Sequence, residues 1–222
     1  MNFIFLFIET IIVFLVMILF YRVGKKDGLF LYISFMASLF STIMFKSIDI
    51  LTFEVNLGIP LIMGIYVCSN IIIQKYGIDE VKDIIKSFVI PYFAIIIISL
   101  VSLISSSEYN MITNNSFDGL FGYNLTNVRL YISALLSIGF TLWYNVYVYY
   151  YIRKIRNKYY QSNIGSMLLI QFLESILFVF ISYIGSFEIS IMFGMIVIRY
   201  FLKIVIGIIS LLPVGIILKM KA

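Results

Sequence analysis

A carboxylate inside an apolar stretch is the feature of this chain that points most directly to chemistry. Glu174 lies within the run Ser166–Ile184, away from the polar segments. Placing a charged acid near the centre of a bilayer costs roughly 2.5–3.5 kcal/mol on insertion scales, so the group must be paired or line a polar cavity. Arg199 and Lys203, four residues apart in the next apolar run, are the candidate partners. The sequence therefore predicts a polar site inside a membrane bundle.

Other polar residues fall inside or at the ends of apolar runs at helical spacing. Two pairs, three or four residues apart, each share one helix face, and an arginine opens a further run about four turns before an asparagine. If these faces turn inward, the bundle surrounds a common cavity with one acid, three bases and several amides. The candidate ligand-binding residues are therefore Asn70, Gln74, Arg129, Asn145, Gln171, Glu174 and Lys203.

Each of these groups also has a purely structural explanation. Asn70 and Gln74 are equally typical of hydrogen bonds that hold membrane helices together. Arg129 is equally typical of an anchor whose long side chain reaches the membrane surface, and we favour that interpretation for Arg199, near the start of its run. Lys203 lies deeper, and a structural ion pair with Glu174 is its alternative role. Glu174 itself is the hardest to explain by structure alone.

The composition is that of an integral membrane protein. Of 222 residues, 62% are hydrophobic and only 12% are charged, against about 25% charged in soluble domains. The chain has no histidine, which excludes histidine-based triads, His-ligated metals and histidine proton relays. Its one cysteine, Cys68, excludes a disulfide framework. The formal charge of +5 reflects where the lysines lie and does not indicate a nucleic-acid partner.

Seven apolar runs are long enough to cross a bilayer as helices, for which about 20 residues are needed. Short breaks separate them, so we expect an all-α bundle of six to seven membrane helices in a single transmembrane domain, residues 1–222. The first run contains Glu9 and lacks a basic leader, which favours a membrane segment over a signal peptide. The runs are Phe3–Tyr21, Leu29–Phe45, Leu57–Ile73, Phe88–Ile104, Leu130–Ile152, Ser166–Ile184 and Ile196–Leu218.

Charge alternates from one break to the next. The first, third and fifth breaks and the C-terminal tail carry twelve of the sixteen basic residues. Because cytoplasmic loops are enriched in lysine and arginine, we expect the N-terminus outside the cell and the C-terminus inside. Seven tyrosines between Trp143 and Tyr160 lie beside the fifth break, and we interpret them as an interfacial aromatic belt. The longest break, Ser105–Asn127, is rich in Ser, Asn and Gly and predicts an external loop.

Four stretches follow one another in an order that is typical of one family. Ser69–Gly77 carries polar residues before a final Tyr-Gly, and Asn127–Arg153 is a helix led by arginine that ends in a basic cluster. Gln171 is followed three residues later by the pair Glu174-Ser175, and Lys203 is followed by Pro213. Together they resemble the queuosine precursor transporter family, also called the vitamin uptake transporter family.

The resemblance covers roughly residues 57–218 and leaves out the first run, 3–21. It implies a transporter in the cell membrane that imports a small heterocyclic nutrient, most of all a queuosine precursor: 7-cyano- or 7-aminomethyl-7-deazaguanine, or queuine. We hypothesise that Glu174 accepts the two donors of a guanine-like edge, that Lys203 keeps it ionised, and that neighbouring amides bind the rest. This chain departs from the family where Asn70 and Gln74 stand in place of acids, and where Glu174-Ser175 replaces Asp-Thr.

Two other functions stay open. The chain is also compatible with a substrate-capture subunit that needs energising partner subunits, or with a structural membrane protein that has a polar core. The sequence has no Gly-x-x-x-x-Gly-Lys-Ser/Thr loop, so we do not expect the chain to hydrolyse ATP itself. It also shows no clear small-xxx-small stripe for docking an energising subunit, which favours a carrier that acts alone, with a homo-oligomer as an alternative assembly. We expect no enzyme activity, no cofactor and no metal. The expected partners are a small-molecule substrate and the lipid bilayer.

Overall fold

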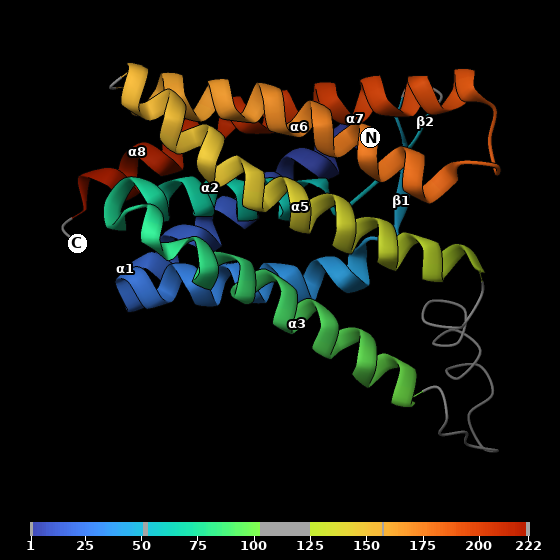
Figure 1. The fold of residues 1–222 in the computed structure, drawn as a ribbon, viewed down its shortest axis with the longest axis horizontal. Coiled ribbons are helices and arrows are strands. Elements are labelled where there is room, and N and C mark those ends of the chain that lie inside the picture. The colour runs from blue at the N-terminus through green and yellow to red at the C-terminus, as the bar shows by residue number, and fades with distance from the viewer. Residues whose placement is uncertain (1, 51–52, 103–124, 157, 221–222) are drawn as a thin grey trace.

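A computed structural model describes residues 2–50, 53–102, 125–156 and 158–220 as a bundle of long helices (Figure 1). A hairpin of two short antiparallel strands, β1 (Ser47–Ile50) and β2 (Phe53–Asn56), follows the first helix. This hairpin lies in the second break and was not predicted from the sequence. The helices are α1 (Asn2–Ile43), α2 (Ile59–Tyr76), α3 (Val81–Ser102), α5 (Leu125–Arg156), α6 (Tyr159–Tyr183), α7 (Ile189–Ile209) and α8 (Leu211–Lys219), with a 3₁₀ turn at Ile78–Glu80.

The α1 segment is a helical hairpin that reverses at Lys25, where φ of 50° and ψ of −120° are not helical. Tyr32 Oη donates a hydrogen bond to Val13 O at 3.2 Å, and the rings of Phe20 and Phe35 stack 5.7 Å apart. In a straight helix, residues 19 apart would lie about 28 Å from each other. The two arms are therefore antiparallel neighbours, as Figure 1 shows, and correspond to the first two predicted spans.

The all-α membrane fold predicted from the sequence is confirmed. Within the described residues, five helical stretches are long and apolar enough to cross a membrane. Because the first stretch reverses at Lys25, the five stretches form six membrane-crossing helices. The α3 helix packs against α1 as a seventh. The five stretches are Phe3–Ile43, Ile59–Tyr76, Asn127–Arg156, Tyr159–Tyr183 and Ile189–Lys219.

Several helices begin well before the apolar runs that predicted them. The α3 helix begins at Val81 and α6 at Tyr159, each seven residues before its run. An apolar run marks the part of a helix that suits hydrocarbon, and the helix itself continues into the polar zone. The seventh run is divided at Ser210, and Pro213 lies in the first turn of α8, where its missing N–H breaks no helical hydrogen bond. Residues 103–124, most of the predicted external loop, lie outside the described residues.

The basic breaks gather at one end of the bundle (Figure 1). Lys26 pairs with Glu80 at 2.7 Å, which joins the first break to the third. Lys75 Nζ donates to Met220 O at 2.7 Å, which joins the third break to the tail. Arg153 donates to the end of α2 and adds the fifth break. The hairpin and the α6–α7 connection lie at the opposite end, so the bundle separates the breaks as the charge alternation predicts.

The α2 helix forms the centre of the bundle, because every residue from Ile59 to Ile73 is buried. The surrounding helices turn large apolar side chains outward: Phe7, Ile97 and Phe201 are each more than half exposed. Such faces suit lipid, so the interior of this bundle is distinguished by its polar residues and not by its apolar ones. Buried polar side chains on α2, α5, α6 and α7 are therefore the candidates for function.

The close packing of the α1 hairpin on α2 predicts a position that is sensitive to volume. A Cβ at Gly64 would overlap Tyr32 Oη and Val13 Cγ1, one atom from each arm of the hairpin. Because overpacking costs about 1–3 kcal/mol, we expect Gly64→Val to lower the melting temperature of the purified protein. Gly139→Val is the matched control, since a Cβ at Gly139 would meet no atom within 4 Å. Equal melting temperatures for the two variants would contradict this packing.

Candidate functional site

Three ionic side chains meet in the bundle between α6 and α7. Lys203 Nζ contacts Glu174 Oε2 and donates to Ser175 Oγ at 3.1 Å. Arg199 Nη2 lies 3.5 Å from Glu174 Oε1, and the guanidinium covers the ring of Phe178 at 4.1 Å. Glu174 and Lys203 are fully buried and Arg199 is 4% exposed. The predicted pairing of Glu174 with Lys203 is confirmed.

Arg199 is a correction to the sequence interpretation, which favoured a side chain that reaches the membrane surface. The apolar run begins at Ile196 and so predicts that Arg199 lies near a helix end. The α7 helix in fact begins at Ile189, which places Arg199 almost three turns inside. With one acid and two bases, this triad carries a surplus of positive charge in the bundle interior. A bound acceptor group would offset that surplus.

A cluster of amides and hydroxyls joins α2, α5 and α6. Asn70 Nδ2 donates to Asn163 Oδ1 at 2.7 Å and lies 3.4 Å from Ser166 Oγ. Asn145 Nδ2 donates to Asn70 Oδ1 at 2.8 Å and to Ser69 Oγ at 3.2 Å. All five side chains are buried. Because most of these groups satisfy one another, the cluster fastens the three helices together.

Gln74 lies one turn beyond Asn70, towards the basic end. Its Oε1 accepts hydrogen bonds from Tyr149 Oη at 2.9 Å and from Arg153 Nε at 2.7 Å. Both donors come from α5, and a shallow hollow opens beside these residues. Gln74 therefore belongs to the basic end of the seam between α2 and α5, away from the ionic triad.

Polar residues occupy every fourth position of α5, and only part of this row lies in the seam with α2. Each step turns about 40° past a full turn, so the row winds around the helix. Arg129 thus faces the end of α6, whereas Thr141 and Asn145 contact α2. Three of the hydroxyls donate to the carbonyl four residues earlier and are satisfied within α5. The row is Arg129, Ser133, Ser137, Thr141, Asn145, Tyr149 and Arg153.

Gln171 differs from the other amides because its side chain has no partner. It is 1% exposed, and neither its Oε1 nor its Nε2 has a hydrogen-bond partner among the described residues. Gln171 and Lys203 line a cavity of about 110 Å³ between α6 and α7. Buried polar atoms without partners are rare and are expected where another molecule binds. Gln171 therefore holds two unsatisfied polar atoms one turn from Glu174, although the surface of the cavity beside it is almost entirely apolar.

Arg129 lies at the end of the bundle opposite Gln74. Its guanidinium donates to Ile184 O at 2.6 Å and to Ser186 Oγ at 3.1 Å. It therefore closes the C-terminal end of α6, where unpaired carbonyls favour a cation, and does not simply reach the membrane surface. Arg129 and Arg199 both line a second cavity, of about 380 Å³.

The predicted residues turn inward but do not surround one common cavity. Glu174, Lys203 and Gln171 come together at the triad, while Asn70 and Asn145 meet in the amide cluster. Gln74 and Arg129 lie towards opposite ends. Sequence reasoning missed the burial of Arg199 and the role of Asn163, which lies before the predicted run of its helix. The four-residue period of the α5 row is a signal that would have placed Ser133, Ser137 and Thr141 in the seam.

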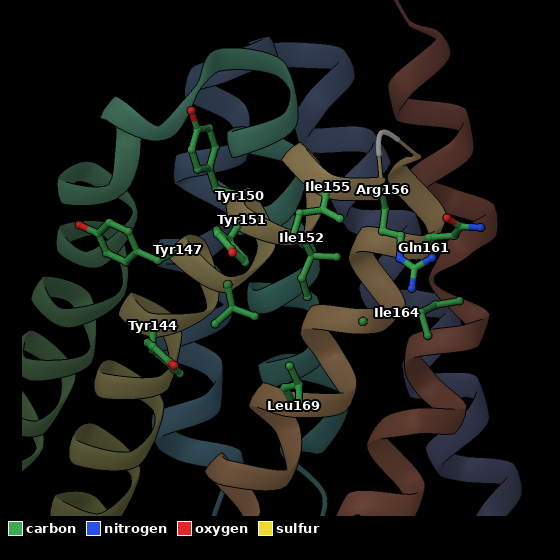
Figure 2. Close-up of a pocket in the computed structure, with 12 residues that line it drawn as sticks. Tyr144, Tyr147, Tyr150, Tyr151, Ile152, Ile155, Arg156, Gln161, Ile164 and Leu169 are labelled. Carbon is green, nitrogen blue, oxygen red and sulfur yellow. The ribbon is translucent and has the colours of Figure 1, made fainter.

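A larger hollow lies elsewhere on the described part of the molecule. It has a volume of about 1150 Å³ and lies between α5 and α6 on their outward faces (Figure 2). Tyr144, Tyr147, Tyr150 and Tyr151 line it and are exposed. Its lining includes none of the predicted site residues, and Arg156 is its one charged side chain. These tyrosines fit the predicted interfacial belt, whereas Tyr149 and Tyr159 of the same tract are buried.

Comparison with known sequences identifies the relatives of this chain. Residues 56–218 match the family described as "Putative vitamin uptake transporter". The chain belongs to the vitamin uptake transporter family. A relative from Bacillus subtilis (strain 168), named "Probable queuosine precursor transporter", is 24% identical over 208 residues, which cover 91% of this chain and 88% of the relative. No solved structure matches the chain.

The protein is therefore a multi-pass transporter of a small molecule in the cell membrane, and not an enzyme. The family match spans every predicted site residue from Asn70 to Lys203 and leaves α1 outside. The family resemblance predicted from four short motifs is confirmed.

The triad predicts an order of stability among its variants. Glu174→Gln leaves two buried cations without a counter-charge, and breaking a buried pair in this way costs about 3–5 kcal/mol. Lys203→Met leaves Glu174 paired with Arg199 and should cost less. We expect thermal unfolding of the purified proteins to rank wild type first, Lys203→Met second and Glu174→Gln last. A Glu174→Gln protein at least as stable as Lys203→Met would show that the carboxylate does not hold the two cations.

Proposed function

We propose that this transporter imports a queuosine precursor, a 7-deazaguanine base such as 7-cyano- or 7-aminomethyl-7-deazaguanine, or queuine. The observation that carries the proposal is the fully buried carboxylate of Glu174, held by Lys203 and Arg199 one turn from the unpartnered amide of Gln171. The family and the name of the Bacillus subtilis relative support the same class of solute.

The chemistry of a guanine-like edge fits a carboxylate. Such an edge presents two adjacent N–H donors beside a carbonyl acceptor, and one carboxylate accepts both donors in strong, charge-assisted hydrogen bonds. Lys203 now contacts that carboxylate and also donates to Ser175 Oγ. Ser175 thus gives the ammonium an acceptor of its own while the donors of the solute occupy Glu174. The exchange leaves the ammonium with a hydrogen-bond acceptor.

Gln171 is the amide best placed to complete the contact. Leaving a buried donor or acceptor unpaired costs about 1–3 kcal/mol, so a solute that pairs with Gln171 recovers part of that energy. Its cavity already touches Lys203. Asn70 and Asn145 bind each other and so reach a solute only when α2, α5 and α6 separate. We propose that Asn70, Asn145 and Gln74 close the site at the basic end of the bundle. Arg129 lies at the opening at the opposite end.

The direction of the bundle follows from its charges. The basic breaks and the tail lie at one end, and we propose that this end faces the cytoplasm, with the N-terminus outside. Solute then enters from the end that holds Arg129. We propose that the carrier acts alone, with no energising partner subunit. A purely structural role would explain the amide cluster, most of whose groups satisfy one another, but it gives no reason for Gln171, whose two polar atoms both lack a partner among the described residues.

Uptake by cells that cannot make 7-deazaguanines tests the proposal. Wild type is expected to import labelled 7-cyano-7-deazaguanine, and Glu174→Gln should import at least tenfold less, because hydrogen bonds to a charged group contribute about 1.5–3 kcal/mol. Glu80→Gln is the matched control, since it removes an acid at the basic end and should import normally. The double change Glu174→Asp with Ser175→Thr restores the family pattern and is expected to keep uptake.

Different outcomes test the identity of the substrate and the role of Glu174 separately. Membrane content of each variant is measured by immunoblot, so that loss of uptake is not loss of protein. Undiminished import by Glu174→Gln would rule out the carboxylate as the substrate-binding group. Absence of import by wild type, with the protein in the membrane, would rule out these bases as the solute.

A further inference from the structure

A cavity of about 380 Å³ opens at the end of the bundle opposite the basic breaks, where α5, α6 and α7 meet the hairpin. Arg129 lines it from the start of α5 and Arg199 from within α7, and Ser182 lies between them on α6. We call it the arginine cavity. Among its described lining residues there is no acidic side chain. The cavity therefore favours a solute that carries negative charge or acceptor atoms.

The two arginines differ in whether their hydrogen-bond donors already have partners. Arg129 already donates to backbone carbonyls of α6 and to Ser186. Arg199 is 4% exposed, and its Nε has no hydrogen-bond partner among the described residues. Ser182 Oγ is equally buried and equally without a partner. Arg199 and Ser182 thus each hold one unsatisfied polar atom just behind the wall of this cavity, and such atoms are expected where a polar molecule binds.

Arg199 also belongs to the triad, since its Nη2 lies 3.5 Å from Glu174 Oε1. The arginine cavity and the carboxylate thus share one guanidinium. We infer that this cavity is the outer access site of the transporter, where Arg199 and Ser182 bind the carbonyl or anionic group of a small polar solute next to the carboxylate that accepts its donors. The identity of that solute rests on the proposed function.

The arrangement matches the order of groups on a guanine-like edge. On such an edge the carbonyl is the direct neighbour of the first N–H donor. Arg199 and Glu174, neighbours in the triad, are placed for a carbonyl and for donors respectively. When the donors of the solute bind Glu174, the guanidinium of Arg199 loses part of its counter-charge. The carbonyl of the solute, by accepting from Arg199, compensates for that loss. Arg199 is accordingly a residue that determines which acceptor-bearing solutes enter.

Thiol labelling tests the cavity without any assumption about the solute. The chain has a single cysteine, Cys68, which is buried and donates to Leu29 O, so Cys68→Ser keeps the hydrogen bond and gives a silent background. Ser182→Cys places a thiol in the cavity. Ser133→Cys is the matched control, because Ser133 is buried near the same end but does not line the cavity. Both are treated in intact cells with membrane-impermeant methanethiosulfonates, one anionic and one cationic.

We expect the Ser182→Cys thiol to react from outside, and to react with the anionic reagent on the order of tenfold faster than with the cationic one. Arg199→Gln in the same background should reduce that preference; it leaves Glu174 and Lys203 paired, so the fold is preserved. The Ser133→Cys thiol should not react. An excess of 7-cyano-7-deazaguanine should slow the labelling at Ser182→Cys.

Failure of this inference and failure of the proposed function give different results. Labelling only from the cytoplasmic side, or no anionic preference, overturns the access site whatever the cells import. Import of the base by wild type without protection of the Ser182→Cys thiol also overturns it. An anionic preference that depends on Arg199, in cells that import none of these bases, upholds the cavity and refutes the proposed solute instead.

Discussion

The need to compensate one buried negative charge constrains the whole interior of this protein. Glu174 cannot remain ionised among apolar helices without a cation, and it has two, both from α7. Because Arg199 and Lys203 are one turn apart, they fix the register of α7 against α6 around the carboxylate. Removing the acid leaves both cations uncompensated, and removing both cations leaves the acid uncompensated. The remaining polar groups are arranged around this fixed point.

Two kinds of polar interior are present, and they differ in how completely they are satisfied. Along the seam between α2 and α5, the amide of Asn70, the hydroxyl of Thr141 and the amide of Gln74 all find partners on the facing helix. Near the triad, Gln171 and Arg199 retain three polar atoms without partners among the described residues, against Asn145 Oδ1 alone among the amides of the seam. A satisfied network stabilises one arrangement of helices, whereas an unsatisfied one gains free energy from a solute. This contrast separates the part of the interior that holds the bundle from the part that binds.

The sequence predicted the apolar helices and the central ion pair, but not the β-hairpin or the axial offsets between neighbouring helices. Apolar runs, charge alternation and the depth of Lys203 and Glu174 are local properties. They were sufficient to predict the helices, the separation of the breaks and the ion pair. Arg199 and Asn163 were misjudged for one reason: runs of apolar residues begin later than the helices that contain them. Whether Gln74 and Gln171 share a cavity depends on the axial offset between α2 and α6. Tertiary packing sets that offset, and the spacing of residues within one helix does not predict it.

The central claim is that the carboxylate of Glu174 accepts both donors of a guanine-like edge. Its most direct test is calorimetric titration of the purified protein with 7-cyano-7-deazaguanine and with the analogue that lacks the exocyclic amine. Losing one hydrogen bond to a charged group costs about 1.5–3 kcal/mol, so the account predicts binding at least tenfold weaker for the analogue. Equal affinity for the two compounds would contradict it.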